Sequence, residues 1–386
     1  RHALHRHVLD AAVGPAARAR LHRGIAAALQ RIRGRAAADG AAELALHCER
    51  GHEPSAAAGW YLQAARNARQ RLAQAEALAL VDRGLRLLEP LPPGPARAAE
   101  LPLLSLRIAG QMTTFGHGLA AAAVSSRRAL ALMDRLPLAA AIAPLWHAVW
   151  WVHARGGDWP AAAEISGRMA ALIDDPERAD HPLAALQAQR GIFALHHGRH
   201  AEAIEALDRA LAVLDAIPSG ETAPVFVQDL AIECLAHQSL ALEFAGRAGL
   251  ARQARARLQA RIDAGTDPLS ETTGLWFIAF QHLLRGDLDA LGAVEVRAMA
   301  GIEGRDALSG TGPHRVVRGW HGVMTARDDD ERDRALALCG DGARIYAGHG
   351  ARSGMPVMHR LHAEALIRCR RLDEANEALL TAARLC

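Results

Sequence analysis

Prolines recur along this chain at a nearly constant interval, and this spacing restricts the fold more than any other feature of the sequence. Between Pro54 and Pro356, eight prolines stand about 43 residues apart. Proline is favoured in the first turn of an α-helix, because its fixed φ angle suits the helix and its missing N–H group needs no partner there. The spacing therefore predicts one helix start per repeat, at Pro54, Pro95, Pro137, Pro182, Pro224, Pro268, Pro313 and Pro356.

A second break in the helical pattern follows most of these prolines by roughly 20 residues. These breaks contain glycine, which ends a helix in the left-handed conformation, or aspartate, which caps the next helix. No stretch has the β-branched and aromatic pattern of a strand. We therefore predict an all-α fold, a right-handed α-α superhelix of about eight helix-turn-helix repeats. The breaks lie at residues 116–118, 156–158, 198–200, 246–249, 286–287, 328–330 and 370–373.

The second helices of the repeats share a pattern of small residues and leucines. Residues 200–214 and 74–88 place alanine or glycine beside leucine at positions i, i+3, i+4 and i+7. Small side chains let two helices approach closely, and the leucines fill the seam between neighbouring repeats. Because 51% of the residues are hydrophobic and only 4% are aromatic, we expect a core made mainly of Ala and Leu.

Residues 198–211, GRHAEAIEALDRAL, resemble the second half of a tetratricopeptide repeat (TPR), although the period here is longer than the 34 residues of that repeat. The longer variety is similar to the C-terminal repeats of bacterial STAND-class signalling ATPases, which include MalT-type transcription activators. The segment RLHR at residues 20–23 matches a helix that precedes the first repeat in that family. Glu43, Leu44, Ala45 and His47 match a second helix that precedes the first repeat in the same family. The resemblance covers nearly the whole chain.

The resemblance implies a TPR-like solenoid that acts as a sensor. In the STAND family the repeat array binds an inducer or a partner protein and shifts an ATPase module between an inactive and an assembled state. The resemblance places that module before Arg1 in the same polypeptide, so we expect this chain to be part of a longer protein. Residues 1–35 would end a winged-helix-like segment and its connecting helix, and residues 36–386 would form the TPR-like superhelix.

Every basic residue of the chain is arginine. Without lysine there is no Schiff-base lysine, no phosphate-loop lysine and no lysine general base. The sequence also contains no phosphate loop, no nucleophile elbow and no zinc-protease helix. We therefore predict that the chain is not an enzyme and has neither catalytic residues nor a cofactor. A helical-solenoid enzyme is the less favoured alternative.

The five cysteines and twenty histidines do not form a metal-binding pattern. The cysteines are scattered without a Cys-x-x-Cys pair, which fits a reducing cytoplasm better than a disulfide scaffold. His196, His197 and His200 cluster, but they straddle the turn at Gly198 and lack an acidic or cysteine partner at ligand spacing. The acidic run at residues 328–331 is expected to cap a helix rather than to hold a divalent ion. We predict a cytoplasmic protein without a metal site.

Residues 1–35 contain eight arginines and one aspartate, a basic balance that is also found in nucleic-acid-binding arms. No interleaved aromatic residues or recognition-helix pattern accompany it, so we expect this segment to pack on the upstream module and not to contact nucleic acid directly. The most apolar stretch, residues 138–152, is interrupted by Pro144 and His147 and is shorter than the roughly 20 apolar residues of a membrane span. We expect no membrane contact, and homo-oligomerisation stays open.

Aromatic residues gather in the first helices of a few repeats. Trp146, Trp150 and Trp151 lie on one expected helix, and the first two share a face at spacing i, i+4. In an array of Ala and Leu, such rings could line the concave groove and grip a ligand or a peptide. The alternative, which is the more common role of large rings, is that they fill gaps between helices. The candidate ligand- or peptide-binding residues are Trp146, Trp150, Trp151, Trp276, Phe280 and Trp320.

Together these patterns favour a regulatory or sensor repeat domain. A solenoid offers a long concave groove, lined by the first helix of each pair, for a protein partner or a small-molecule effector. We predict that occupation of this groove controls the upstream ATPase module in transcription or signalling. The alternative function is a stand-alone TPR-like scaffold for protein–protein interaction.

Overall fold

The computed structural model describes residues 13–71, 73–113, 118–134, 142–173, 180–217, 228–302 and 311–385 of the chain. Within these ranges the chain forms eighteen α-helices and two 3-10 helices, with no β-strand. The predicted all-α fold is therefore confirmed. The chain divides into two compact units, Arg1–Gly110 and Gln111–Cys386.

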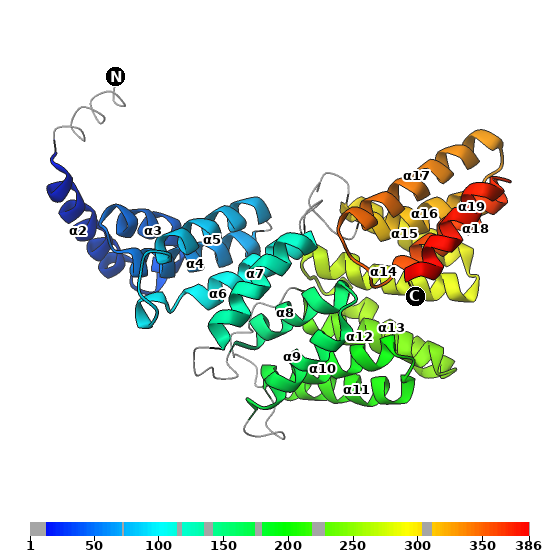
Figure 1. Ribbon diagram of the computed structural model, residues 1–386, viewed down its shortest axis with the longest axis horizontal. Helices are drawn as coiled ribbons and strands as arrows, with labels where there is room; N and C mark the ends of the chain where they lie inside the picture. Colours follow the sequence, from blue (N-terminus) through cyan, green and yellow to red (C-terminus); the bar gives the residue numbers. More distant parts are fainter. Residues whose placement is uncertain are drawn as a thin grey trace. The chain divides into compact units, whose positions relative to one another are not determined.

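The first unit consists of helices that pack on one another in sequence order. α2 packs on α3, and α4 packs on both α3 and α5 (Figure 1). One cluster in its interior packs Ala26, Ala45, Cys48 and Ala57 around the Tyr61 ring, and leucines such as Leu44 and Leu88 are fully buried as well. The predicted domain boundary at residue 35 falls within η1 and stays a prediction. The elements are α2 (Pro15–Arg33), η1 (Gly34–Gly40), α3 (Ala41–Arg50), α4 (Pro54–Gln70), α5 (Gln74–Leu88), η2 (Pro95–Arg97) and α6 (Glu100–Thr113), whose last residues belong to the second unit.

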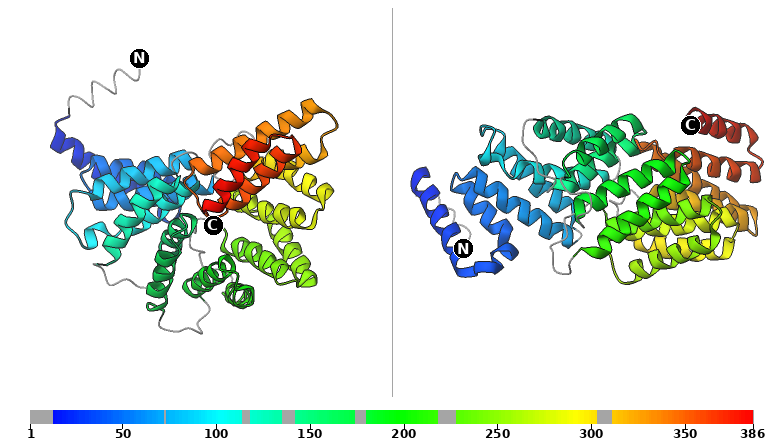
Figure 2. Two further views of the ribbon diagram at one scale, coloured as in Figure 1. Left: turned by 45° about the vertical axis from the view of Figure 1, so that its right-hand side comes forward. Right: turned by 90° about the horizontal axis from the view of Figure 1, so that it is seen from below.

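The second unit is a stack of helix pairs. The two helices of each pair pack together, and from α8 to α18 the first helix of each pair also packs on the first helix of the next pair. Figure 2 shows these pairs following one another along a curved path, from green through yellow to red. In sequence order, the described helices from α4 to α19 make eight successive helix pairs, in line with the repeat number of about eight that the sequence predicts. The helices are α7 (Gly118–Met133), α8 (Ala143–Arg155), α9 (Trp159–Ala170), α10 (His181–His196), α11 (His200–Ala216), α12 (Leu230–Phe244), α13 (Ala248–Asp263), α14 (Pro268–Arg285), α15 (Leu288–Ile302), α16 (Thr311–Thr325), α17 (Asp329–Gly348), α18 (Met355–Arg368) and α19 (Leu372–Leu385).

The periodic prolines mark helix starts in most of the repeats. Pro313 is the third residue of α16, also within the first turn. Pro95 begins the 3-10 helix η2 instead, and α6 starts only after it. Pro137 and Pro224 lie outside the described residues. The prolines found at the first or second helical position are Pro54, Pro182, Pro268 and Pro356.

The turns between the helices contain the predicted capping residues. Gly198 and Gly286 adopt left-handed φ angles of 71° and 68° just beyond the ends of α10 and α14. The side chain of Asp328 accepts a hydrogen bond from the backbone N–H of Glu331 at the start of α17. The acidic run therefore caps a helix, as predicted. Side chains that cap α9, α10, α12 and α14 in the same way are Asp158, Asp180, Asp229 and Asp267.

Helices approach most closely where glycine faces the backbone of a neighbour. A Cβ atom at Gly319 of α16 would stand 2.4 Å from the backbone nitrogen of Cys339 on α17. In the other direction, a Cβ atom at Gly342 of α17 would stand 2.6 Å from the backbone nitrogen of Val316. No side chain fits at such distances, so these two helices touch through their backbones. The predicted role of small residues in close helix packing is confirmed here.

One buried ion pair joins three helices of the second unit. His314 on α16 and Glu295 on α15 have no exposed surface, and Nδ1 of His314 lies 2.9 Å from the Glu295 carboxylate. Its Nε2 lies 3.0 Å from the carbonyl oxygen of Thr272 on α14. Because both ring nitrogens face acceptors, both must donate, and the ring is cationic. Burial opposes this charge, but Glu295 and the Thr272 carbonyl outweigh burial and raise the pKa of His314.

The backbone contact between α16 and α17 predicts that Gly319→Ala destabilises the protein by about 1–3 kcal/mol, because the new methyl group must push the helices apart. The matched control is Gly167→Ala in α9, where an added Cβ meets nothing within 4 Å. That change should stabilise the helix by roughly 0.5–1 kcal/mol through the loss of glycine's backbone freedom. Urea denaturation measures both. Equal effects of the two substitutions would contradict the close approach.

The His314–Glu295 pair predicts a pH-dependent stability. Since the pKa of His314 is higher in the folded protein than its unfolded value of about 6.5, the added stability is complete below that pH. It is lost as the pH rises through the folded pKa. We expect the free energy of unfolding of the wild type to decrease above pH 6.5 more steeply than that of His314→Gln, in urea denaturation at a series of pH values. Parallel curves for the two proteins would exclude this role.

Candidate functional site

A cavity of about 150 Å³ lies within the second unit and is lined mainly by the first helices of the repeats. α8, α10, α12 and α14 contribute successive parts of its wall. Met112 at the end of α6 and residues of α16, α17 and α18 complete it. The stacking of repeats thus brings together side chains from Met112 to Met358. Six of the sixteen lining residues carry aromatic or imidazole rings, namely Trp151, His196, His237, Trp276, Phe277 and Tyr346.

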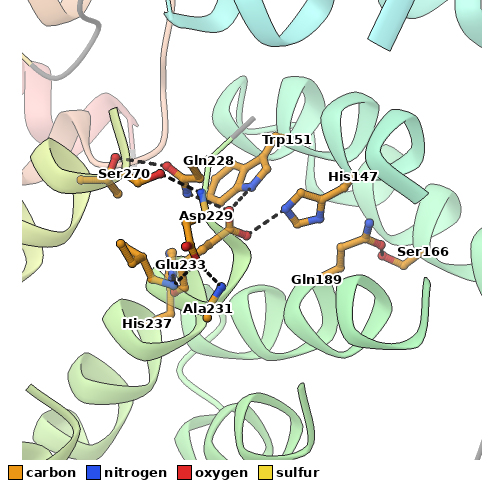
Figure 3. Close-up of polar contacts among 12 residues, drawn as sticks. His147, Trp151, Ser166, Gln189, Gln228, Asp229, Ala231, Glu233, His237 and Ser270 are labelled. Atoms are coloured by element: carbon orange, nitrogen blue, oxygen red, sulfur yellow. Dashed lines mark hydrogen bonds and ion pairs between the residues drawn. The ribbon is translucent and has the colours of Figure 1, made fainter. Parts of the chain in front are cut away.

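A buried carboxylate holds two of the lining residues in place (Figure 3). Glu233 on α12 has no exposed surface, and its carboxylate accepts hydrogen bonds from Trp151 Nε1 at 3.1 Å and Gln228 Nε2 at 2.7 Å. Its other oxygen lies 3.0 Å from Nε2 of His147 on α8. Burial by itself would raise the pKa of Glu233, but the charge and hydrogen bond of His147 outweigh it and lower that pKa. The carboxylate therefore ties α12 to α8 and orients Trp151 and Gln228 at the cavity.

The two histidines of the cavity wall are neutral at pH 7. Burial lowers the pKa of His237, although Glu233 partly offsets this effect. Burial, followed by the nearby His237 and His197, lowers the pKa of His196 to about 4. Nδ1 of His237 donates to the backbone carbonyl of Glu233 at 2.8 Å, which leaves its Nε2 as an acceptor. The His237 ring packs on Phe277, with centroids 4.5 Å apart.

Arg155 is the charged residue of the lining. Its backbone carbonyl, at the end of α8, accepts the N–H groups of Arg352 at 2.7 Å and Ser353 at 3.2 Å, so the segment before α18 lies against α8. Arg155 is half-buried, and its side chain has no carboxylate partner among the described residues. Nor does any described Asp or Glu side chain line the cavity. The site therefore combines aromatic walls with one uncompensated positive charge.

The aromatic residues singled out in the sequence divide between cavity and core. Trp151 and Trp276 line the cavity. Trp146 and Trp150 are 2% and 0% exposed and pack inside the second unit, in the gap-filling position that was the alternative expectation. Phe280 is also buried, but it stacks on Trp276 with ring centroids 5.3 Å apart. Trp320 lies elsewhere, because its Nε1 donates to Glu364 between α16 and α18.

Sequence reasoning missed Glu233, Gln228, His237 and Arg155. The signal for Glu233 was present, because it interrupts an apolar run in α12, a helix that is buried on nearly every side. A charged residue in such a helix must be paired, so it marks a polar network. The position of Arg155 carried no comparable signal, because arginine at a helix end also fits the helix dipole.

The clustered histidines do not gather around a metal. Among the described residues, no group of three or more His, Cys, Asp or Glu side chains is arranged to hold a metal ion. His196 and His197 pack against Trp159 instead, with centroids 4.7 and 5.5 Å from its ring. As for membranes, none of the described helices combines the length and the apolar character that crossing a bilayer requires.

The burial of Trp150 predicts a stability effect. We expect Trp150→Ala to lower the free energy of unfolding by about 3–5 kcal/mol, because it leaves a large void in the second unit. Trp150→Phe keeps part of the packing and should lower it less. Urea denaturation followed by circular dichroism gives both values. An unchanged transition in Trp150→Ala would show that this ring is not part of the core.

No model of a known protein family matches the sequence, and no curated protein does either. Solved structures nevertheless resemble the fold. A Rap protein complexed with Competence and Sporulation Factor is 11% identical, with a TM-score of 0.63 over 96% of this chain and 97% of that chain. Aspartyl phosphate phosphatase F from Bacillus subtilis is 12% identical, with a TM-score of 0.50 over 91% of this chain and 94% of that chain. At such identities the likeness extends to the fold alone, a TPR-like superhelix of stacked helix pairs.

Proposed function

We propose that this chain is a regulatory domain that binds a segment of a partner protein or a small effector in the cavity of the second unit. The observation that carries the proposal is the cavity wall, which four consecutive first helices build together. A ligand held there contacts several repeats at once, so its binding free energy favours one stacking of those repeats over others. Small changes at many repeat interfaces then add up to a change of the surface that a partner contacts.

The fold comparison supports a binding role for a stack of this kind. The Rap protein was solved in complex with Competence and Sporulation Factor, a binding partner of that protein. For this chain we propose the same general use of the fold, with a ligand of its own. The aromatic lining and the buried Glu233 network supply what such a site needs, namely rigid apolar walls and a few oriented polar groups.

The finer proposal is that binding controls an ATPase module of the same polypeptide in transcription or signalling. It is supported by the resemblance of residues 20–23 and 43–47 to the helices that precede the repeats of STAND-class ATPases. The coding sequence upstream of Arg1 tests it directly. We expect a phosphate loop of the form Gly-x4-Gly-Lys-Ser/Thr there, and an upstream region without one would contradict the ATPase proposal but not the cavity.

The second candidate is a stand-alone scaffold without an ATPase. It is favoured by one observation, the likeness of the fold to a Rap protein that was solved in complex with Competence and Sporulation Factor. A scaffold would hold its partner with an occupied or an empty cavity. A regulatory domain would bind the partner differently in the two states.

A cavity-blocking variant tests the proposed site. Thr273 lines the cavity, and Thr273→Trp should fill it. The matched control is Thr325→Trp, the same change at an exposed position at the end of α16. The probes are a panel of tripeptides and one- and two-ring compounds, each as acid, amide and amine, measured by thermal unfolding. A ligand at 100 times its Kd stabilises the folded state by about 2.7 kcal/mol.

We expect at least one compound class to stabilise the wild type and the control variant but not Thr273→Trp. Circular dichroism must show the same helical content in all three proteins. The proposal fails if no compound shifts the transition of the wild type, or if the blocked variant is stabilised equally.

A further inference from the structure

Nε2 of His237 can accept a hydrogen bond at the cavity, whereas two donors there lack an acceptor among the described residues. The buried indole N–H of Trp276 has no acceptor among the described residues. The guanidinium of Arg155 also lacks one in the described part of the chain. In contrast, the hydroxyl groups of Thr273 and Tyr346 donate to Gln228 Oε1 at 3.1 Å and to the Ser353 carbonyl at 2.5 Å. Two donors without acceptors at one cavity favour a ligand that accepts hydrogen bonds.

The charge of the site has the same implication. His196 and His237 are neutral at pH 7, because burial lowers the pKa of each. The negative charge of Glu233 is engaged by His147, Trp151 and Gln228, and Glu233 is not part of the lining. The positive charge of Arg155 is therefore balanced by nothing on the described wall. A planar guanidinium matches the two oxygens of a carboxylate, to which it can donate two parallel hydrogen bonds.

The size and shape of the cavity indicate which kind of group is attached to the carboxylate. An apolar protein cavity of about 150 Å³ holds one benzene ring, and this cavity has about that volume. Its walls are flat, because Trp276 is fixed by stacking on Phe280 at an interplanar angle of 6° and packs edge-on against Phe277 at 5.0 Å. Aromatic walls favour a planar apolar body in stacked or edge-to-face contact.

We propose that the cavity binds a carboxylate attached to a single aromatic ring, with Arg155 holding the carboxylate and Trp276 contributing its N–H group and its ring face. The chemistry is shared by a free aromatic acid and by the C-terminal aromatic residue of a peptide. This inference rests on the proposed function, because it names the ligand class of the same cavity.

Isothermal titration calorimetry with four probes tests the inference. The probes are phenylacetate, phenylacetamide, the tripeptide Ala-Ala-Phe with a free carboxylate, and the same tripeptide as its C-terminal amide. We expect at least one acid to bind the wild type about 10- to 100-fold more tightly than its amide, the range expected for a charged hydrogen-bonded pair. If phenylacetate binds as tightly as the tripeptide acid, the source is a free acid; if only the tripeptide acid binds, it is a peptide C-terminus.

Arg155→Gln should weaken the acid about 10- to 100-fold and remove the difference between acid and amide. The control is Arg344→Gln, at a side chain that is 78% exposed on α17, and it should bind like the wild type. Should Arg155→Gln not fold, Trp276→Phe keeps an aromatic ring but removes the N–H donor, and it should weaken the acid about 5- to 10-fold.

Two results would overturn the inference. If acid and amide bind equally well, and Thr273→Trp abolishes the binding of both, the proposed recognition of a carboxylate is wrong. The proposed binding function of the cavity would still stand. If none of the four probes binds, the inference about the ligand class is also wrong. The wider panel of compounds tested with Thr273→Trp then decides separately whether the cavity binds a ligand.

Discussion

Close contact between helix backbones is the constraint on which the second unit depends. At Gly319 and Gly342 there is no room for any side chain between α16 and α17. At Gly191 of α10, a Cβ atom would stand 2.5 Å from Cγ of the Leu207 side chain and 3.2 Å from the backbone carbonyl oxygen of Ala203 on α11. Because a helix pair at this separation has a fixed geometry, each pair presents its first helix to the next pair in a defined orientation. The first helices of successive pairs make most of the wall of the cavity.

The interior consists mainly of Ala and Leu, and the few buried polar residues within it need hydrogen-bonding partners. An unpaired buried carboxylate would cost several kcal/mol, so Glu233 is tolerated only with its full set of partners. Those partners, Trp151 and Gln228, are also residues of the cavity wall. A hydrophobic residue at position 233 would satisfy packing more simply. We therefore interpret the retained charge as a device that positions the wall of the proposed binding site.

His314 and Glu295 form a second buried pair of a histidine and a carboxylate, and this pair joins helices. Their ion pair lies between α14, α15 and α16, and Nε2 of His314 lies 3.0 Å from the backbone carbonyl oxygen of Thr272, a residue that lines the cavity. The pair thus holds α14, α15 and α16 together next to the part of the cavity wall that Thr272 forms. Two buried carboxylates of the second unit, each paired with a histidine, flank the same space from neighbouring repeats.

The sequence alone determined the repeat. Prolines about every 43 residues, with glycine and aspartate at the intervening turns, predicted the helix pairs, because helix starts and stops depend on local backbone chemistry. It also located the aromatic residues but not their directions, since Trp150 and Trp151 are neighbours and yet one is core and the other cavity wall. Which face of a helix meets the cavity is decided by the rotation of each pair against the next. That rotation, and with it the convergence of Arg155, His237 and Trp276 on one cavity, exists only in the tertiary structure, because it depends on contacts between residues far apart in the chain.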